Sequence, residues 1–80
     1  MKRYRLYGTS ACHLCELAEE MLQALDEQGV SVEYDKVDIT ESDELFERYG
    51  LVIPVLQGPR GTELFWPFES VELRRFIVAD

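Results

Sequence analysis

The stretch GTSACHLCELAEEML, from Gly8 to Leu22, places two cysteines at the start of a segment with helical periodicity. Cys12 and Cys15 are the only cysteines in the chain, and two residues separate them. One helix face carries apolar residues at positions i, i+4, i+7, i+8 and i+11, namely Leu14, Ala18, Met21, Leu22 and Leu25. The pattern predicts a long helix that begins at the cysteine pair and ends at Gly29, a residue suited to a left-handed cap.

Strand patterns flank this helix on both sides. RYRLYG (3–8) alternates apolar and charged residues, and VSVEYDKVDI (30–39) is rich in β-branched residues and alternates again. Thr40 and Asp43 then have the spacing of a capping box, which predicts the start of a short helix that Gly50 ends.

The last third of the chain predicts a hairpin and a final helix. LVIPVLQ (51–57) and ELFWPF (63–68) read as strands, joined by the turn residues GPRG (58–61). Ser70 is expected to cap the final helix, whose buried side is predicted to consist of Val71, Phe76 and Ile77, with Leu73 beside them. The predicted order is βαβαββα, a four-stranded mixed sheet flanked by three helices in one α/β domain that spans 1–80, with a right-handed crossover between the first two strands.

The composition excludes several classes of function. Sixteen acidic residues against eight basic ones give a formal net charge of −8, which argues against binding nucleic acid or an anionic membrane surface. No apolar run approaches the roughly 18 residues of a membrane span. No apolar stretch of signal-peptide type follows the basic N-terminus. The expectation is a cytoplasmic monomer without nucleic-acid or membrane partners.

Two close thiols allow three interpretations: redox chemistry, metal binding, or a structural pair. For redox chemistry, Thr9 and Ser10 act as helix caps and Cys12 lies in the first helical turn, where the backbone N–H groups favour a thiolate. Cys12 is then the accessible nucleophile, and Cys15, one turn further on, is the more buried resolving thiol. A tetrahedral zinc site needs four ligands, whereas Cys12, His13 and Cys15 supply three at most, so no metal site is predicted.

Pro54 precedes an apolar strand, where a proline does not fit an ordinary position in a central ladder. If the Ile53–Pro54 bond is cis, the chain turns sharply there and leaves the Ile53 backbone to pair with an extended, thiol-bearing peptide. An edge-strand proline is the alternative. His13 flanks the first cysteine and Tyr7 lies near the end of the first strand, so both join Ile53 and Pro54 as candidate substrate-binding residues.

Together, the order of elements, the Cys12-x-x-Cys15 pair and the Ile53-Pro54 segment resemble the thioredoxin fold, and most closely the small bacterial glutaredoxin-like proteins with a Cys-His-Leu-Cys sequence. The resemblance implies a thiol–disulfide oxidoreductase that acts on protein or small-molecule disulfides without a bound cofactor. It also implies that Cys12 is the nucleophile, Cys15 the resolving thiol, and Pro54 a cis-proline that shapes the substrate groove.

The chain departs from the usual glutaredoxin pattern in places. His13 and Leu14 stand where a Pro-Tyr pair is usual, and WPFES (66–70) replaces a Gly-Gly pair ahead of the last helix. Glu69 in this segment is expected to repel glutathione, which carries net negative charge. The dependence on glutathione is therefore predicted to be weak, although glutathione stays a possible co-substrate. The alternative function is a catalytically poor binding module that docks a protein partner through the Trp66–Phe68 edge.

Overall fold

The computed structural model describes residues 3–79, so residues 1, 2 and 80 of the predicted domain lie outside the described range. The elements are β1 (Arg3–Gly8), α1 (His13–Glu27), β2 (Glu33–Asp38), the 3-10 turn η1 (Ile39–Glu41), α2 (Asp43–Tyr49), β3 (Val55–Gln57), β4 (Glu63–Phe65) and α3 (Ser70–Ala79). The predicted order of strands and helices is confirmed. The turn η1 was not predicted.

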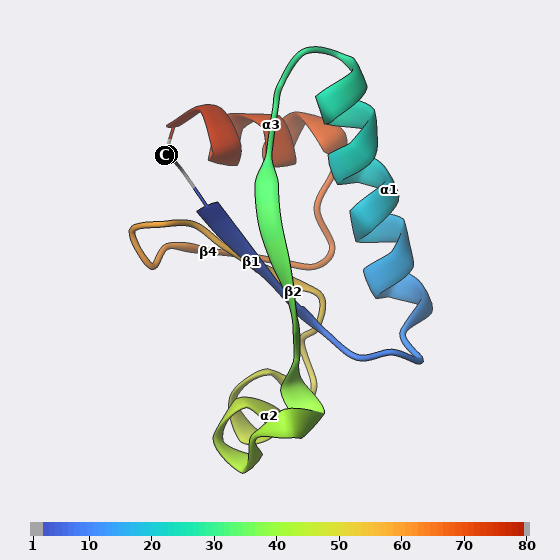
Figure 1. The fold of residues 1–80 in the computed structure, drawn as a ribbon, viewed down its shortest axis with the longest axis vertical. Coiled ribbons are helices and arrows are strands. Elements are labelled where there is room, and N and C mark those ends of the chain that lie inside the picture. Colours follow the sequence, from blue (N-terminus) through green and yellow to red (C-terminus); the bar gives the residue numbers. More distant parts are fainter. Residues whose placement is uncertain (1–2, 80) are drawn as a thin grey trace.

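The four strands form one mixed sheet in the order β2-β1-β3-β4. β1 runs parallel to β2, with Tyr4 opposite Tyr34, and antiparallel to β3, with Leu6 opposite Leu56. β3 and β4 form the predicted antiparallel hairpin. Figure 1 shows α1 alongside the sheet, with α3 and α2 towards opposite ends of the molecule. Because β3 lies between β1 and β4, Pro54 leads into a central strand, and the edge-strand interpretation is wrong.

The alternation of residues along the strands produces two apolar cores. Tyr4 and Leu6 of β1 point to the side that α1 and α3 cover, where they pack with Leu56 and other buried residues. Tyr7 and Val55 point to the other side, where Ile39 and Tyr49 cover them. Burying one large apolar side chain contributes roughly 1.5–3 kcal/mol to stability. Because each face of the sheet has its own core, both faces contribute to the stability of this small sheet.

The start of α2 differs from the prediction. The Ser42 hydroxyl, not Thr40, caps α2 by accepting a hydrogen bond from the Leu45 N–H at 3.3 Å. Thr40 belongs instead to η1, where its N–H and hydroxyl donate to Asp38. The prediction was wrong because the chain makes an extra turn before α2 begins. Gly29 does adopt a positive φ of 93° after α1, as predicted.

The last helix also differs in detail. Ser70 is its first residue, and the Glu72 carboxylate accepts a hydrogen bond from the Glu69 N–H at 3.0 Å, so the predicted Ser70 cap is wrong. Leu73 and Ile77, four residues apart, form the buried side, and Phe76 is partly buried against the same core, whereas Val71 is half exposed. The buried stripe is narrower than predicted because the helix packs its i and i+4 positions onto the sheet.

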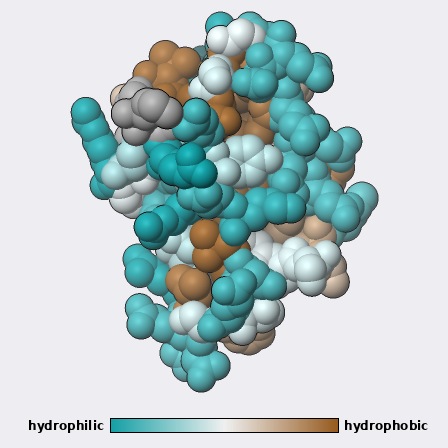
Figure 2. All heavy atoms as spheres, in the orientation of Figure 1, coloured by the Kyte–Doolittle hydropathy of each residue, from teal (hydrophilic) through white to brown (hydrophobic). Residues whose placement is uncertain are grey.

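The face of the molecule drawn in Figure 2 is mostly polar. In Figure 2, hydrophilic residues cover most of the face that is drawn, and apolar groups show in separate areas. Among residues 3–79, none of the helices has both the length and the apolar character needed to span a bilayer.

Candidate active site

The first helix begins at the cysteine pair itself. Cys12 has extended backbone angles and is the residue that caps α1; its sulfur accepts a hydrogen bond from the Cys15 N–H at 3.1 Å. The expectation that Thr9 and Ser10 act as caps is therefore wrong, because the chain enters the helix two residues later. A sulfur in this position lies where free N–H groups and the helix dipole favour negative charge.

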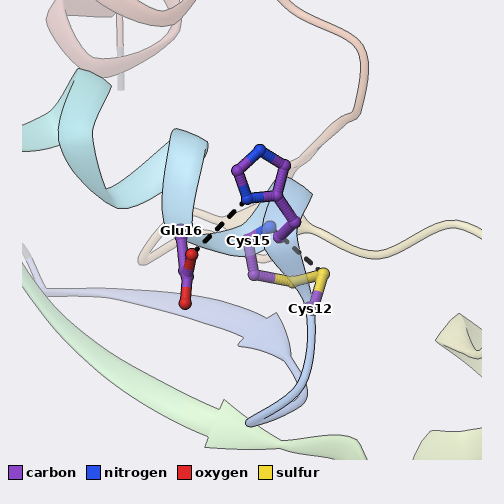
Figure 3. Close-up of a disulfide and its surroundings, with 4 residues drawn as sticks. Cys12, Cys15 and Glu16 are labelled. Carbon is purple, nitrogen blue, oxygen red and sulfur yellow. Dashed lines mark hydrogen bonds and ion pairs between the residues drawn. A yellow bond between two sulfur atoms is a disulfide. The ribbon is translucent and has the colours of Figure 1, made fainter.

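Cys12 and Cys15 are joined by a disulfide, with their Cα atoms 5.2 Å apart (Figure 3). Cys15 is only 6% exposed, whereas Cys12 is partly exposed. The predicted difference in accessibility between the two thiols agrees with this geometry. Gly8 lies against the inner cysteine: a Cβ atom at this position would be 2.7 Å from the Cys15 sulfur. The end of β1 therefore has room for the disulfide only because residue 8 has no side chain.

A cleft of about 300 Å³ opens beside the disulfide, between the first turns of α1 and the carboxyl end of β2. We call it the cysteine cleft. Its walls are formed by Leu6, Gly8, Thr9, Ser10, Cys12, Cys15, Glu16, Glu19, Lys36, Val37, Asp38 and Glu41. The cleft lies on the β2 side of β1. Pro54, which precedes the residue paired with Tyr7, lies on the β3 side.

Carboxylates dominate the charge of the cysteine cleft. Lys36 Nζ lies 3.6 Å from Glu19, so its charge is largely compensated. Glu16 is 3.6 Å from the exposed imidazole of His13 (Figure 3). The hydroxyl and backbone N–H of Thr40 hydrogen-bond to the Asp38 carboxylate and lower its pKa, which keeps it ionised. The cleft is therefore an acidic environment next to the Cys12–Cys15 disulfide.

Ile53 and Pro54 form the segment in which a cis bond and a free backbone were predicted. The Ile53–Pro54 peptide bond is cis, and Pro54 is fully buried at the start of β3. The Ile53 N–H donates to the Tyr49 carbonyl at 3.1 Å, so the prediction that this backbone is free is wrong for its donor group. A second cis bond, Trp66–Pro67, was not predicted.

Tyr7 and His13 have opposite surroundings. Tyr7 is 5% exposed, and its ring stacks on Tyr49 at a centroid distance of 4.4 Å. Its hydroxyl donates a hydrogen bond to the Gln57 side-chain oxygen. Its side chain belongs to the core, so no described contact supports its predicted role in substrate binding. The His13 side chain is 79% exposed in the first turn of α1, where a substrate is able to reach it. Its role stays a prediction.

Within residues 3–79, no three or more His, Cys, Asp or Glu side chains are grouped as metal ligands. Sequence reasoning also missed three residues of the cysteine cleft: Lys36, Asp38 and Glu41. A usable signal was present, because β1 and β2 were predicted to be parallel, and the carboxyl ends of parallel neighbours lie at the same edge of a sheet. The residues after β2 therefore had to lie near the loop that carries Cys12.

Comparisons with known proteins agree with this geometry. A family model described as "Glutaredoxin-like domain (DUF836)" matches residues 3–78. The crystal structure of target protein XcR50 from X. campestris is 38% identical, covers 96% of this chain and 97% of its own, and superposes with a TM-score of 0.83. A search of curated proteins found no match.

Two oxidised thioredoxins show the same fold at lower identity. Thioredoxin O2 from Arabidopsis thaliana is 21% identical, with a TM-score of 0.67 over 99% of this chain and 74% of its own. Mitochondrial thioredoxin 3 from Saccharomyces cerevisiae is 17% identical, with a TM-score of 0.66 over 99% of this chain and 78% of its own. The fold of this chain is therefore thioredoxin-like, as predicted.

Proposed function

The chain belongs to the family of glutaredoxin-like domains, and on that premise we propose that it is a thiol–disulfide oxidoreductase. One observation carries the proposal: Cys12 and Cys15 form a disulfide at the start of α1, with the capping sulfur partly exposed and the other sulfur buried. An exposed sulfur at a helix N-terminus is the arrangement that favours a reactive thiolate.

The proposed reaction begins with the reduced dithiol. The Cys12 thiolate attacks one sulfur of a substrate disulfide, forms a mixed disulfide, and displaces one substrate thiolate. Cys15 then loses its proton and attacks the Cys12 sulfur, which releases the second substrate thiolate. The substrate disulfide gains two electrons, and the protein dithiol becomes the Cys12–Cys15 disulfide. An external thiol reductant must regenerate the dithiol.

The Cys15 N–H contributes to the first step in this proposal. It donates to the Cys12 sulfur at 3.1 Å in the oxidised protein. In the reduced protein the same donor is positioned to stabilise a thiolate, because a hydrogen bond to the charged form lowers the pKa of an acid. No bound cofactor is needed for this exchange. Protein disulfides and small-molecule disulfides are both candidate substrates.

Paired single-cysteine variants test the reaction. The pre-reduced wild-type protein is expected to reduce a protein disulfide faster than an equal concentration of a simple dithiol. Cys15→Ser should accumulate a mixed disulfide through Cys12, which mass spectrometry detects, and Cys12→Ser should form none. A wild-type rate no higher than that of the simple dithiol, or adduct formation by both variants alike, would argue against an oxidoreductase.

We further propose that glutathione is a poor co-substrate. The N–H of Glu69 is already bonded to the Glu72 carboxylate, so an internal anion occupies the start of α3. A glutathione carboxylate would meet this negative charge together with that of Glu69. The double variant Glu69→Gln/Glu72→Gln should react with glutathione disulfide about threefold faster than the wild type, because two repulsive charges are removed.

The matched control for the glutathione test is Glu20→Gln/Glu27→Gln, which removes two exposed charges of α1. It should leave the rate unchanged. Rapid reduction of glutathione disulfide by the wild-type protein would overturn the proposal of weak glutathione dependence without affecting the dithiol chemistry.

A binding module is the second candidate, and exposed apolar side chains favour it. Leu51 is fully exposed, and Phe46 and Phe65 are about half exposed. In the predicted Trp66–Phe68 edge, Phe68 is buried, and its ring meets the Trp66 ring edge-on with the two centroids 5.0 Å apart. The Phe68 side chain is therefore not available to a partner. A module of this kind would bind its partner equally well with both cysteines changed to serine, whereas an oxidoreductase would lose its function.

The cellular setting is also a proposal. The protein is expected to act as a monomer in the cytoplasm, where dithiols are kept reduced. Sedimentation at micromolar concentration checks the oligomeric state. A redox titration against glutathione buffers checks whether the cysteine pair is reduced at the glutathione redox potential of the cytosol.

A further inference from the structure

Both cysteines line the cysteine cleft, and the proposed chemistry does not use its other walls. Its volume of about 300 Å³ is at the lower end of the range of ligand pockets, roughly 300–1,000 Å³. The first turns of α1 form one wall; the other wall consists of Lys36, Val37 and Asp38 at the end of β2 and Glu41 of η1. A group bonded to the Cys12 sulfur therefore has this space directly beside it.

The charges around this space do not cancel. Four carboxylates, those of Glu16, Glu19, Asp38 and Glu41, face one amine, that of Lys36. Lys36 pairs with Glu19, which leaves three acidic side chains. The exposed His13 lies near Glu16 but is outside the lining. Glu41 has no ion-pair partner among the described residues. A positive group on the substrate would therefore be attracted, and a negative one repelled.

We propose that the cysteine cleft selects polypeptide disulfides in which lysine or arginine flanks the cysteine attacked by Cys12. This inference rests on the proposed oxidoreductase function and names its substrate class. The flanking cation would enter the cleft and approach Asp38 and Glu41 while the disulfide meets the exposed sulfur. The covalent steps are those given above. The cleft affects only encounter and orientation, so the effect should appear in the second-order rate and depend on salt.

Two disulfide peptides, identical except for lysine or glutamate beside each cysteine, test the selection. The pre-reduced wild-type protein should reduce the lysine peptide about tenfold faster than the glutamate peptide at low ionic strength, because charge steering changes association rates by this order or more. The preference should shrink at high salt. In Asp38→Asn/Glu41→Gln, the low-salt preference should fall to about a third of its wild-type value.

Glu27→Gln/Glu47→Gln serves as the matched control, because it makes the same change in net charge at exposed positions outside the cleft. It should retain most of the preference. Alkylation by neutral iodoacetamide measures the reactivity of Cys12 in each double variant. Because the preference is a ratio of two rates for the same thiol, a change in that reactivity cancels from it.

The outcomes separate the two proposals. Equal rates for the two peptides, or an equal loss of preference in both double variants, would overturn the cleft selection and leave the oxidoreductase function standing. If the wild-type protein reduces neither peptide, the proposed function fails and the selection fails with it.

Discussion

Gly8 and Cys15 are in direct contact across the end of β1 and the first turn of α1: a Cβ atom on Gly8 would lie 2.7 Å from the Cys15 sulfur and 3.2 Å from its Cβ atom. The Cys15 side chain has little freedom to withdraw, because it is buried and bonded to Cys12. The close approach of this strand to the helix is what holds the inner sulfur in place.

Gly8→Ala should therefore destabilise the oxidised protein by about 1–3 kcal/mol, the usual cost of overpacking a filled interior. Urea unfolding of the oxidised protein measures this change. Ser10→Ala, in the exposed loop that follows, is the control and should have little effect. An unchanged free energy of unfolding in Gly8→Ala would contradict the contact described above.

Glu16→Gln should make Cys12 more reactive. Glu16 lines the same cleft as Cys12, so its negative charge opposes formation of the thiolate. Removing the charge should speed alkylation of Cys12 in the reduced protein about threefold at neutral pH. Glu20→Gln is the matched control, because Glu20 is exposed on the same helix and does not line the cleft. A slower reaction in Glu16→Gln, or the same gain in both variants, would contradict the prediction.

Tyr49→Phe tests a partly buried polar contact between Tyr49 of the second core and the β3–β4 hairpin. The Tyr49 hydroxyl donates to the Glu63 carboxylate, to which Gln57 also donates. Its loss should cost about 1–2 kcal/mol at neutral pH, as for other hydrogen bonds to a charged acceptor. Urea unfolding of the two proteins measures the difference.

The same variant predicts an alkaline pH dependence. Burial, followed by the contact with Glu63, raises the pKa of Tyr49 in the folded protein. A raised pKa gives a contribution to stability that is fully present below the unfolded value of about 10 and is lost as the pH rises above it. The difference between the wild type and Tyr49→Phe should therefore shrink above about pH 10. A difference that stays constant up to pH values around 11 would contradict the shift.

Asp38→Asn tests how the stability of the protein depends on pH in the acidic range. Hydrogen bonds from the Thr40 hydroxyl and N–H lower the pKa of Asp38. A lowered pKa gives a contribution that is present above the unfolded value of about 3.9 and is lost as the pH falls through the folded value. Asparagine keeps the capping acceptor but removes the charge. The wild type should lose its advantage over the variant as the pH falls below about 4.

Thr40→Ala provides the comparison for this acid-side test. It removes the hydroxyl donor to Asp38 and keeps the backbone donor. The dependence of its free energy of unfolding on pH should therefore lie between those of the wild type and Asp38→Asn. An advantage of the wild type that persists unchanged at low pH would show that the Asp38 charge is not involved.

Much of the fold followed from local pattern. The alternation in 3–8 and 30–39 and the helical spacing from Leu14 onwards predicted β1, β2 and α1, because each pattern matches the period of its element. The helix caps were less predictable. Thr40 and Ser42 are both good capping residues, and only the path of the chain through η1 decided between them.

By itself, the sequence determined the spacing of the cysteine pair, the order of the elements and the presence of an unusual proline, since spacing and residue type alone express these features. The tertiary structure decided what surrounds the pair. In the folded chain Tyr7 is buried and the Ile53 N–H is hydrogen-bonded to the Tyr49 carbonyl. Asp38 and Glu41 line the same cleft as Cys12. The predicted parallel order of β1 and β2 placed the ends of these strands at one edge of the sheet. The register that brings residues so far apart in the chain into one cleft depends on the pairing of β2 with β1, which no local pattern encodes.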